Sequence, residues 1–456
     1  MNPFTLHLKG GFKNFIERVY DFYFSPCFPF FIGLMALFFY INQWAVLGLL
    51  FFALSASFCF LFFRDVTPIM PLLIMVIMIF NDYDVMNNIL PYICLSPAII
   101  TFIARFFIYP SENIRLNGHF FSLLGVTVAL FSAGIFCSEN NYAQGLVSAG
   151  TLGPVLIIIY IFFRSYINPK NNGEFKKYFC YTLLASGLVV AITVLYYHYH
   201  AIVINDDRIA YFDEIGWANI NCLATFLCLS IPACFYLIAN AERSLIFLPL
   251  LLILYLGVFF TESDGVFLLI TFATPVLIFF TIFKKFAYKR ASFIFVLIAS
   301  ALLIALVYMV IFGVFDVSFI ETNRKSLFTE AQRWFSESPI FGKGLGYINN
   351  DKSQPGPDKH LRNFNFHSTY YHVLATMGIV GIIAYFIYFV ARFCILTKKK
   401  TDFNLFMLIA FLLFECYGMV DTAEFNAIPL MTTLTLLIIA VDVANKKADR
   451  ELPLSA

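Results

Sequence analysis

Residues 328–346 read F-T-E-A-Q-R-W-F-S-E-S-P-I-F-G-K-G-L-G, and residues 367–381 read H-S-T-Y-Y-H-V-L-A-T-M-G-I-V-G. Both stretches lie within 316–381, where the longest polar segment of the chain meets the next apolar run. On either side of this segment the chain consists mostly of long apolar runs with short polar connections. The segment therefore divides a hydrophobic scaffold into a long part before it and a shorter part after it.

The composition excludes an ordinary soluble protein. Of the 456 residues, 61% are hydrophobic, only 13% are charged and 58 are phenylalanine. Apolar runs of about 18–22 residues recur, and each is long enough to cross roughly 30 Å of hydrocarbon as a helix. The alternating strands of a membrane barrel are absent from the sequence. We therefore expect an all-α integral membrane protein, a polytopic bundle of about 12–14 transmembrane helices with one long extracytoplasmic loop containing short helices.

Apolar windows predict the positions of the spans. A re-entrant hairpin among the first three windows would reduce the number from about fourteen to about twelve, and either even number returns both termini to one side. The expected spans lie near 28–43, 45–63, 66–80, 88–109, 119–138, 142–163, 178–199, 218–239, 243–260, 265–283, 291–315, 368–392, 403–420 and 426–444.

Charge predicts the orientation, because Lys and Arg are enriched in cytoplasmic loops. Alternate connections are basic on one face and acid-leaning on the other, so we expect cytoplasmic termini and extracytoplasmic segments at 200–217, 260–265 and 316–367. The chain then divides into a transmembrane region (1–315), an outer loop with part of the site (316–367) and a C-terminal transmembrane region with a cytoplasmic tail (368–456). The basic flanks include Lys9, Arg18, Arg64, Arg105, Arg164, Arg243, Lys284, Arg392, Lys398 and Lys446, and the acidic loops include Asp82, Glu139, Asp206, Glu262, Asp421 and Glu424.

The long outer loop contains helical and turn signals. Residues 321–338 have apolar positions at helical spacing, and Pro339 is expected to end that helix. Gly342, Gly344 and Gly346 then predict a flexible or tightly turned connector. The G-K-G-L-G stretch lacks the spacing of a nucleotide-binding loop, so we favour a structural turn over a direct phosphate contact.

His367 is the strongest candidate for chemistry, because it lies where the polar loop enters an apolar span. Anchoring at the membrane interface and proton transfer near neutral pH are equally open readings of such a histidine. His372 is about 140° further round the helix and is interpreted as packing or as a supporting partner. Gly378 and Gly381 allow close helix approach.

Arginines in the outer segments are candidate anion-binding groups. Arg208 lies in an acidic loop, where simple pairing with a neighbouring aspartate is the plainer interpretation. Arg324 and Arg333 are nine residues apart, so they face opposite ways on a straight helix and only one is expected to face a site.

These residues resemble the signature of the O-antigen ligase and O-antigen polymerase family of lipid-linked glycan transferases. The resemblance rests on Arg324, the Trp334-bearing helix, the P-I-F-G-K-G stretch at 339–344, and His367-Ser368 followed after nine residues by G-I-V-G at 378–381. A second block resembles an outer-loop arginine before an Asn-Ala helix: Arg208, then G-W-A-N-I-N-C-L-A with Trp217, Asn219 and Asn221. The similarity covers about 200–390, whereas the first part of the chain matches only in character.

One departure concerns the end of an earlier span. Family members carry Ser-Arg-Gly there, whereas this chain has T-E-S-D-G with Asp264 in the place of the arginine. A clamp of three arginines around a diphosphate is therefore incomplete, and Arg333 or Arg362 is a candidate substitute.

The resemblance implies a glycosyltransferase-type enzyme that transfers or polymerises glycan from an undecaprenyl-diphosphate-linked donor at the extracytoplasmic face of the bacterial inner membrane. Because the outer segments lack an H-x-x-x-H pattern and the long outer loop lacks D-x-D, arginines are expected to meet the charge on the departing diphosphate without a metal or other cofactor. The implied catalytic residues are His367, Arg208 and Arg324. The expected substrate-binding residues are Arg333, Arg362, Trp334, Tyr370, Trp217 and Asn221.

The implied partners are the lipid-linked donor, a glycan or lipid acceptor, membrane lipids and other envelope polysaccharide-assembly proteins, with no nucleic acid. A transporter or flippase for lipid-linked oligosaccharide is the alternative. It predicts paired charges within the membrane and repeated halves. The sequence shows few ionisable residues in the spans, with Glu415 the main one, and no evident repeat, which favours the enzyme. A purely structural envelope subunit is a third reading.

Overall fold

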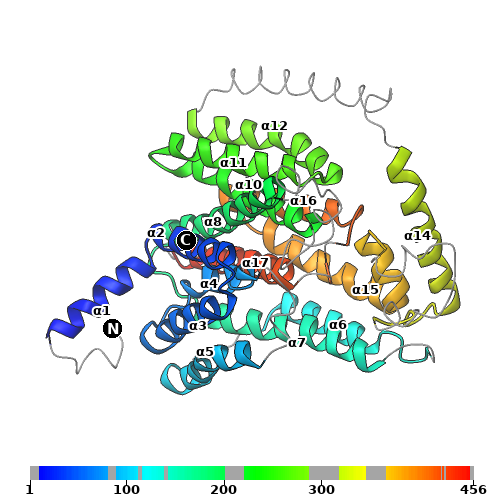
Figure 1. The fold of residues 1–456 in the computed structure, drawn as a ribbon, viewed down its shortest axis with the longest axis horizontal. Coiled ribbons are helices and arrows are strands. Elements are labelled where there is room, and N and C mark those ends of the chain that lie inside the picture. The colour runs from blue at the N-terminus through cyan, green and yellow to red at the C-terminus, as the bar shows by residue number, and fades with distance from the viewer. Residues whose placement is uncertain are drawn as a thin grey trace, which may run out of the picture.

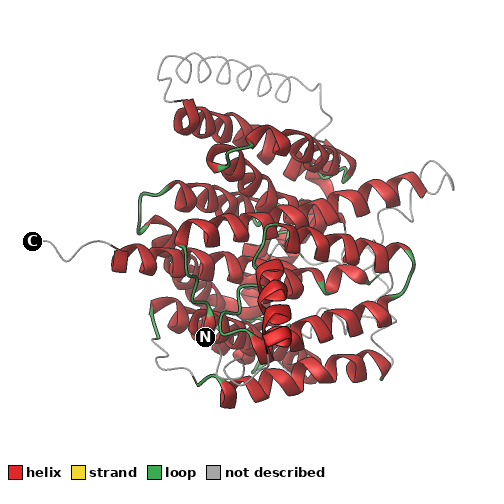
Figure 2. Ribbon diagram, turned by 90° about the vertical axis from the view of Figure 1, so that its left-hand side faces the viewer, coloured by secondary structure: helices red, strands yellow, loops and turns green. Residues whose placement is uncertain are grey.

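The computed structural model describes residues 10–80, 89–110, 116–137, 142–200, 220–286, 318–345, 366–422, 424–425 and 428–451. Every regular element in these ranges is a helix (Figure 2). The main helices are α1 (Gly10–Tyr23), α2 (Cys27–Ile41), α3 (Ala45–Phe62), α4 (Ile69–Met75), α5 (Leu90–Ile108), α6 (Gly118–Ser132), α7 (Tyr142–Tyr166), α8 (Asn172–His198), α10 (Ile220–Asn240), α11 (Phe247–Phe260), α12 (Asp264–Phe286), α14 (Ser318–Glu337), α15 (Thr369–Thr397), α16 (Asp402–Tyr417) and α17 (Ile428–Glu451).

The helices confirm an all-α polytopic membrane protein. Within the described ranges, eight helices are long and apolar enough to cross a membrane, or nine if the α1–α2 pair, bent by 77°, forms one span. The eight are α3, α5, α7, α8, α10, α12, α15 and α17, and two further apolar helices, at Gly118–Ser132 and Ser244–Phe260, are shorter. The expected span at 291–315 lies outside the described residues.

The expected span at 66–80 does not form one continuous helix. It consists of the short helix α4 followed by a 3-10 turn at Ile77–Ile79. Met70, Ile74 and Met78 in this stretch are completely buried. The run is apolar because protein surrounds it, which is a common origin of apolar runs too short to cross a bilayer.

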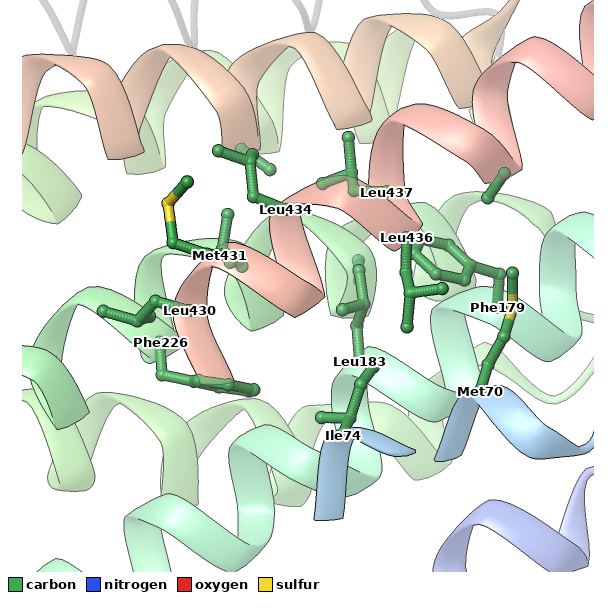
Figure 3. Close-up of a cluster of buried hydrophobic side chains, with 14 of the residues drawn as sticks. Met70, Ile74, Phe179, Leu183, Phe226, Leu430, Met431, Leu434, Leu436 and Leu437 are labelled. Atoms are coloured by element: carbon green, nitrogen blue, oxygen red, sulfur yellow. The ribbon is translucent and has the colours of Figure 1, made fainter. Parts of the chain in front are cut away.

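The centre of the bundle is formed by α8, α10 and α17. In their apolar windows 83%, 100% and 94% of the residues are buried, against 11% in α5, which therefore presents most of its surface to lipid. In Figure 3, side chains from α4, α8, α10 and α17 meet in one cluster, which includes Met70, Ile74, Phe179, Leu183, Phe226 and Leu434.

Three arginines that the sequence placed at cytoplasmic flanks are buried inside the protein. Arg105 donates hydrogen bonds to the carbonyls of Phe63 and Arg64 at 2.7 Å, which satisfies acceptors left open at the end of α3. Arg164 pairs with Asp442 at 2.7 Å. Arg392 is 0% exposed. Their positions in the sequence, near the ends of expected spans, did not reveal that these three side chains lie inside the protein.

α15 was expected as one continuous span, but the structure breaks it at Gly378. This residue has φ 63° and ψ −152°, which is outside the helical region. The rings of Tyr370 and Tyr385 are nevertheless only 5.7 Å apart. On a straight helix fifteen residues would separate them by about 22 Å. The first half of α15 (369–377) therefore folds back beside the second half (379–397).

The segment 339–344 closes the break with backbone hydrogen bonds. The N–H groups of Lys343 and Gly344 donate to the carbonyls of Ala375 and Thr376, at 2.8 and 2.9 Å. On the other side of the break, the N–H of Ile379 donates to the carbonyl of Pro339 at 2.9 Å. Groups that an intact helix would pair internally are thus paired with a second segment. The glycine-rich stretch is a structural turn here, as its spacing predicted.

Gly342 and Gly378 make this backbone contact possible. A Cβ at Gly378 would lie 2.6 Å from the carbonyl oxygen of Ile340, and a Cβ at Gly342 would lie 2.3 Å from the carbonyl carbon of Thr376. Both glycines have positive φ, which a side chain would also oppose. The two glycines that the sequence separates by thirty-six positions therefore form one contact.

Alanine at either glycine is expected to destabilise the protein by about 2–4 kcal/mol, since it combines a left-handed backbone with an overpacked contact. Thermal unfolding of Gly342→Ala and Gly378→Ala in detergent measures the effect. Gly125→Ala in α6 is the matched control, because a Cβ there meets nothing within 4 Å. Equal unfolding temperatures for Gly378→Ala and Gly125→Ala would contradict the contact between Gly342 and Gly378.

Candidate active site

His367 and Asp421 form a side-chain hydrogen bond at the start of the folded-back half of α15. Nδ1 of His367 lies 3.1 Å from Oδ1 of Asp421. The side chain of His367 is 26% exposed and that of Asp421 is 9% exposed, so the imidazole is accessible while its partner is buried. His367 has φ 45°, an uncommon backbone conformation for a side chain other than glycine. Two segments distant in sequence thus hold the histidine in a defined place.

Further hydrogen bonds fix the carboxylate. Tyr417 donates its hydroxyl to Oδ2 of Asp421 at 3.1 Å, and the backbone N–H of Thr422 donates to Oδ1 at 2.6 Å. The hydroxyl of Ser263 lies 3.3 Å from that of Tyr417. A carboxylate that accepts from Nδ1–H leaves the lone pair of a neutral imidazole on Nε2. The arrangement therefore presents His367 as a proton acceptor through Nε2.

The backbone joins the same two segments. The N–H of Thr369 donates to the carbonyls of Gly418 and Asp421, at 2.7 and 3.2 Å. The N–H of Glu424 donates to the hydroxyl of Thr369 at 3.3 Å. The first turn of α15 is thereby attached to the loop that follows α16, and the His367–Asp421 distance depends on this attachment.

α14 lies beside the first part of α15 (Figure 1) and packs on the residue that precedes His367. Its apolar face, with Leu327, Ala331 and Trp334, packs on Phe366, the residue before His367. The rings of Trp334 and Phe366 are 4.9 Å apart at 89°. Trp334 also donates Nε1–H to Glu330 at 2.7 Å and is 8% exposed. In the structure, its contacts are those of a packing anchor.

Other expected site residues have different surroundings. The ring of Tyr370 is half-buried against Tyr385. His372 is buried in the packing around Phe366, in agreement with the packing role predicted for it. Asn221 lies in the first turn of α10. Its neighbour Cys222 is close enough to Asp421 for the carboxylate charge to act on the thiol.

Arg333 lies on the exposed side of α14 and is paired with glutamates of its own helix. Its Nε is 2.9 Å from Glu330, and its Nη1 is 2.7 Å from Glu337. Lys343 reaches Glu337 at 2.7 Å. The hydrogen bond from Arg333 lowers the pKa of Glu330, and that from Lys343 lowers the pKa of Glu337. This network joins α14 to the segment that closes the break in α15.

Four of the predicted site residues lie wholly or partly outside the described residues. Arg208, Trp217 and Arg362 lie outside the described residues. Arg324 belongs to the described helix α14, as predicted, but its side chain lies outside the described part. Of the expected arginines, only Arg333 has a described side chain, and it contacts Glu330 and Glu337.

Asp421 was missed as a site residue. In the sequence it is one of several acidic residues in the expected outer loops. Its one signal was its position directly after a span, which resembles that of His367 directly before one. Fifty-four positions separate the two residues. Among the described residues, no group of three or more His, Cys, Asp and Glu side chains is placed to hold a metal ion.

The T-E-S-D-G stretch also adjoins this site. Ser263 contacts Tyr417, and a Cβ at Gly265 would lie 3.2 Å from the Tyr417 ring. Asp264 itself is exposed at the start of α12. The stretch thus lies beside the hydrogen-bonded carboxylate, with its acidic side chain toward the surface.

A family model described as O-antigen ligase matches residues 248–386. This match confirms the resemblance to the O-antigen ligase and polymerase family. It covers α11, α12, α14, His367 and the break in α15, and it ends before Asp421. No curated protein matches the chain.

The lowered pKa values of Glu330 and Glu337 predict that α14 becomes less stable at acid pH. Folded-state pKa values below the unfolded ones give stability that is present above about pH 4.3 and is lost as the pH falls through the lowered values. We expect amide-exchange protection across 327–345, corrected for the intrinsic exchange rate, to hold near pH 5 and to fall below about pH 4. Glu337→Gln should show a smaller change with pH, and an identical profile would exclude this network as the cause.

Proposed function

We propose that the chain is a membrane glycosyltransferase that takes glycan from an undecaprenyl-diphosphate-linked donor and transfers it to an acceptor hydroxyl, without a metal, at the extracytoplasmic face of the bacterial inner membrane. The match to O-antigen ligases supports a membrane enzyme of polysaccharide biosynthesis. The observation that carries the proposal is the contact between accessible His367 and buried Asp421 at the entry to α15.

His367 acts as the general base in this proposal. As the acceptor oxygen bonds to the anomeric carbon, its proton moves to Nε2 of His367. The bond between that carbon and the diphosphate oxygen breaks, and its electron pair leaves on the diphosphate. Asp421 holds the Nδ1–H tautomer and stabilises the imidazolium that forms. Direct displacement inverts the anomeric configuration.

Arginines balance the charge on the departing diphosphate. A guanidinium remains protonated and its planar fork fits phosphate oxygens, so Arg208 and Arg324 are proposed for this role. The nine-residue spacing puts the Arg324 position opposite Arg333, whose exposed face is already paired with glutamates. Arg362 is the proposed substitute for the arginine replaced by Asp264, and Arg333 takes that role only if it, and not Arg324, faces the donor. Trp217, Asn221 and Tyr370 complete the proposed donor and acceptor contacts, whereas Trp334 acts by packing against Phe366 beside His367.

Two variants of the function share this chemistry. A ligase passes the glycan to a lipid A core or another lipid acceptor, whereas a polymerase extends a second lipid-linked glycan. The His367–Asp421 pair serves either acceptor, because each supplies a sugar hydroxyl. In both cases the proposed topology has cytoplasmic termini and the site in the outer segments, including the loop 316–367.

The transporter alternative gains one observation from the structure. Contrary to the scarcity inferred from sequence, charges are paired inside the bundle: Arg392 contacts Glu415 at 3.0 Å and also contacts Glu424. Paired internal charges are typical of transporters. Here the group is almost completely buried and is bonded to the loop that carries Asp421, which links it to the proposed active site.

The decisive measurement is glycan transfer from purified undecaprenyl-diphosphate donor by protein in proteoliposomes with EDTA. His367→Ala should lower kcat about 10²–10⁴-fold, the usual contribution of a general base. Asp421→Asn should lower it roughly tenfold or more, since the orienting partner is lost. Asp402→Asn is the matched control, because this aspartate forms only a surface pair with Lys284.

Other outcomes have distinct meanings. Transfer that continues unchanged in folded His367→Ala would remove His367 as the base. If wild-type protein moves labelled donor across the bilayer and leaves its diphosphate bond intact, the transporter replaces the enzyme.

A further inference from the structure

Arg392 is the centre of a buried charge group that the proposed chemistry does not use. Its Nη2 lies 3.0 Å from Oε1 of Glu415, and its Nη1 contacts Oε1 of Glu424. The side chains are 0%, 4% and 1% exposed. The guanidinium also lies 3.8 Å from the centre of the Tyr388 ring. One cation thus joins α15 to α16 and to the loop that follows α16.

A group of this kind is a poor means of gaining stability. Removing an arginine and two carboxyl groups from water is costly, and apolar replacements of similar volume are often at least as stable. One cation beside two carboxyl groups also leaves the second carboxyl without a counter-charge of its own in a low-dielectric interior. A role in fixing geometry explains the presence of this group better than its net stability does.

Glu424 connects the charge group to the His367–Asp421 pair. It lies three positions after Asp421, and its N–H donates to the hydroxyl of Thr369. The N–H of Thr369 in turn donates to the carbonyl of Asp421. Holding the Glu424 side chain therefore restrains both the loop that carries Asp421 and the turn that carries His367.

Glu415 has a different set of contacts. It lies within α16, whose own hydrogen bonds fix its backbone, and it accepts a hydrogen bond from Tyr385 at 2.7 Å. It is bonded to the second half of α15 rather than to the turn at Thr369. The two glutamates share the same arginine but differ in their connection to the site.

We propose that Arg392 is a positioning residue for the His367–Asp421 pair and that it acts through Glu424. The proposal rests on the function assigned above to that pair. Arg392 anchors Glu424, Glu424 anchors the loop that follows α16, and this loop holds the Asp421 carboxylate against Nδ1 of His367. Glu415 shares the charge of Arg392 but does not set this distance.

The matched test compares Glu424→Gln with Glu415→Gln. Both substitutions keep the shape of the side chain, and both leave Arg392 with a single carboxylate. Glu424→Gln should lower kcat about tenfold with little change in donor KM, as expected when an orienting contact is weakened. Glu415→Gln should keep kcat within about threefold of wild type.

A spectroscopic readout separates this proposal from the function on which it rests. With ¹⁵N-labelled histidine, the His367 resonances are identified by their loss in His367→Ala. We expect neutral His367 to carry its proton on Nδ1 in wild type and in Glu415→Gln. In Glu424→Gln, as in Asp421→Asn, the Nε2–H tautomer should gain population. This measurement needs no glycan substrate, so it remains informative if wild-type protein lacks transferase activity.

A purely structural role is tested with the triple variant Arg392→Met, Glu415→Gln, Glu424→Gln, which removes all three charges. The proposal expects this protein to unfold near the wild-type temperature while kcat stays low and the tautomer stays mixed. It is overturned if Glu424→Gln keeps the wild-type tautomer. It is equally overturned if both single variants lose activity alike, or if the folded triple variant recovers full kcat.

Discussion

The break in α15 at Gly378 is the constraint on which the site depends. A helix interrupted among apolar neighbours leaves backbone groups unpaired, and such groups are costly where water does not reach them. The segment 339–344 supplies the missing partners to Ala375, Thr376 and Ile379. Because the first half of α15 can then fold back, His367 lies beside the loop after α16. In a straight helix it would lie at the far end.

The same contact explains why the motif contains glycines on both sides of a long insert. Gly342 and Gly378 approach through their backbones, and Lys343 lies between them in the chain with its ammonium on Glu337. A phosphate-binding reading of G-K-G-L-G requires its N–H groups to point at a ligand. The N–H groups of Lys343 and Gly344 instead point at α15. The proposed base and the backbone contact that fixes the fold therefore belong to adjacent parts of one signature.

Sequence patterns predicted the helices well and their internal geometry poorly. Apolar windows located nearly every described helix, because burial in lipid or protein imposes a length and a composition. The helix before Pro339 was also predicted correctly. The fold-back of α15 was not, since a glycine within an apolar run signals close packing as readily as a break. The internal role of Arg392 was hidden by its position near the end of a span.

The candidate site was likewise predicted only in part from the sequence. His367 stands out locally because a polar loop meets an apolar span there, but its partner Asp421 is identified only by a contact across fifty-four positions. Such a partner is informative in a membrane protein, because a buried carboxylate is stable only when hydrogen-bond donors surround it. Asp421 has His367, Tyr417 and the Thr422 N–H around it. Those donors orient the carboxylate toward the imidazole, so the polar groups that stabilise this loop in the protein also define the tautomer of the proposed base.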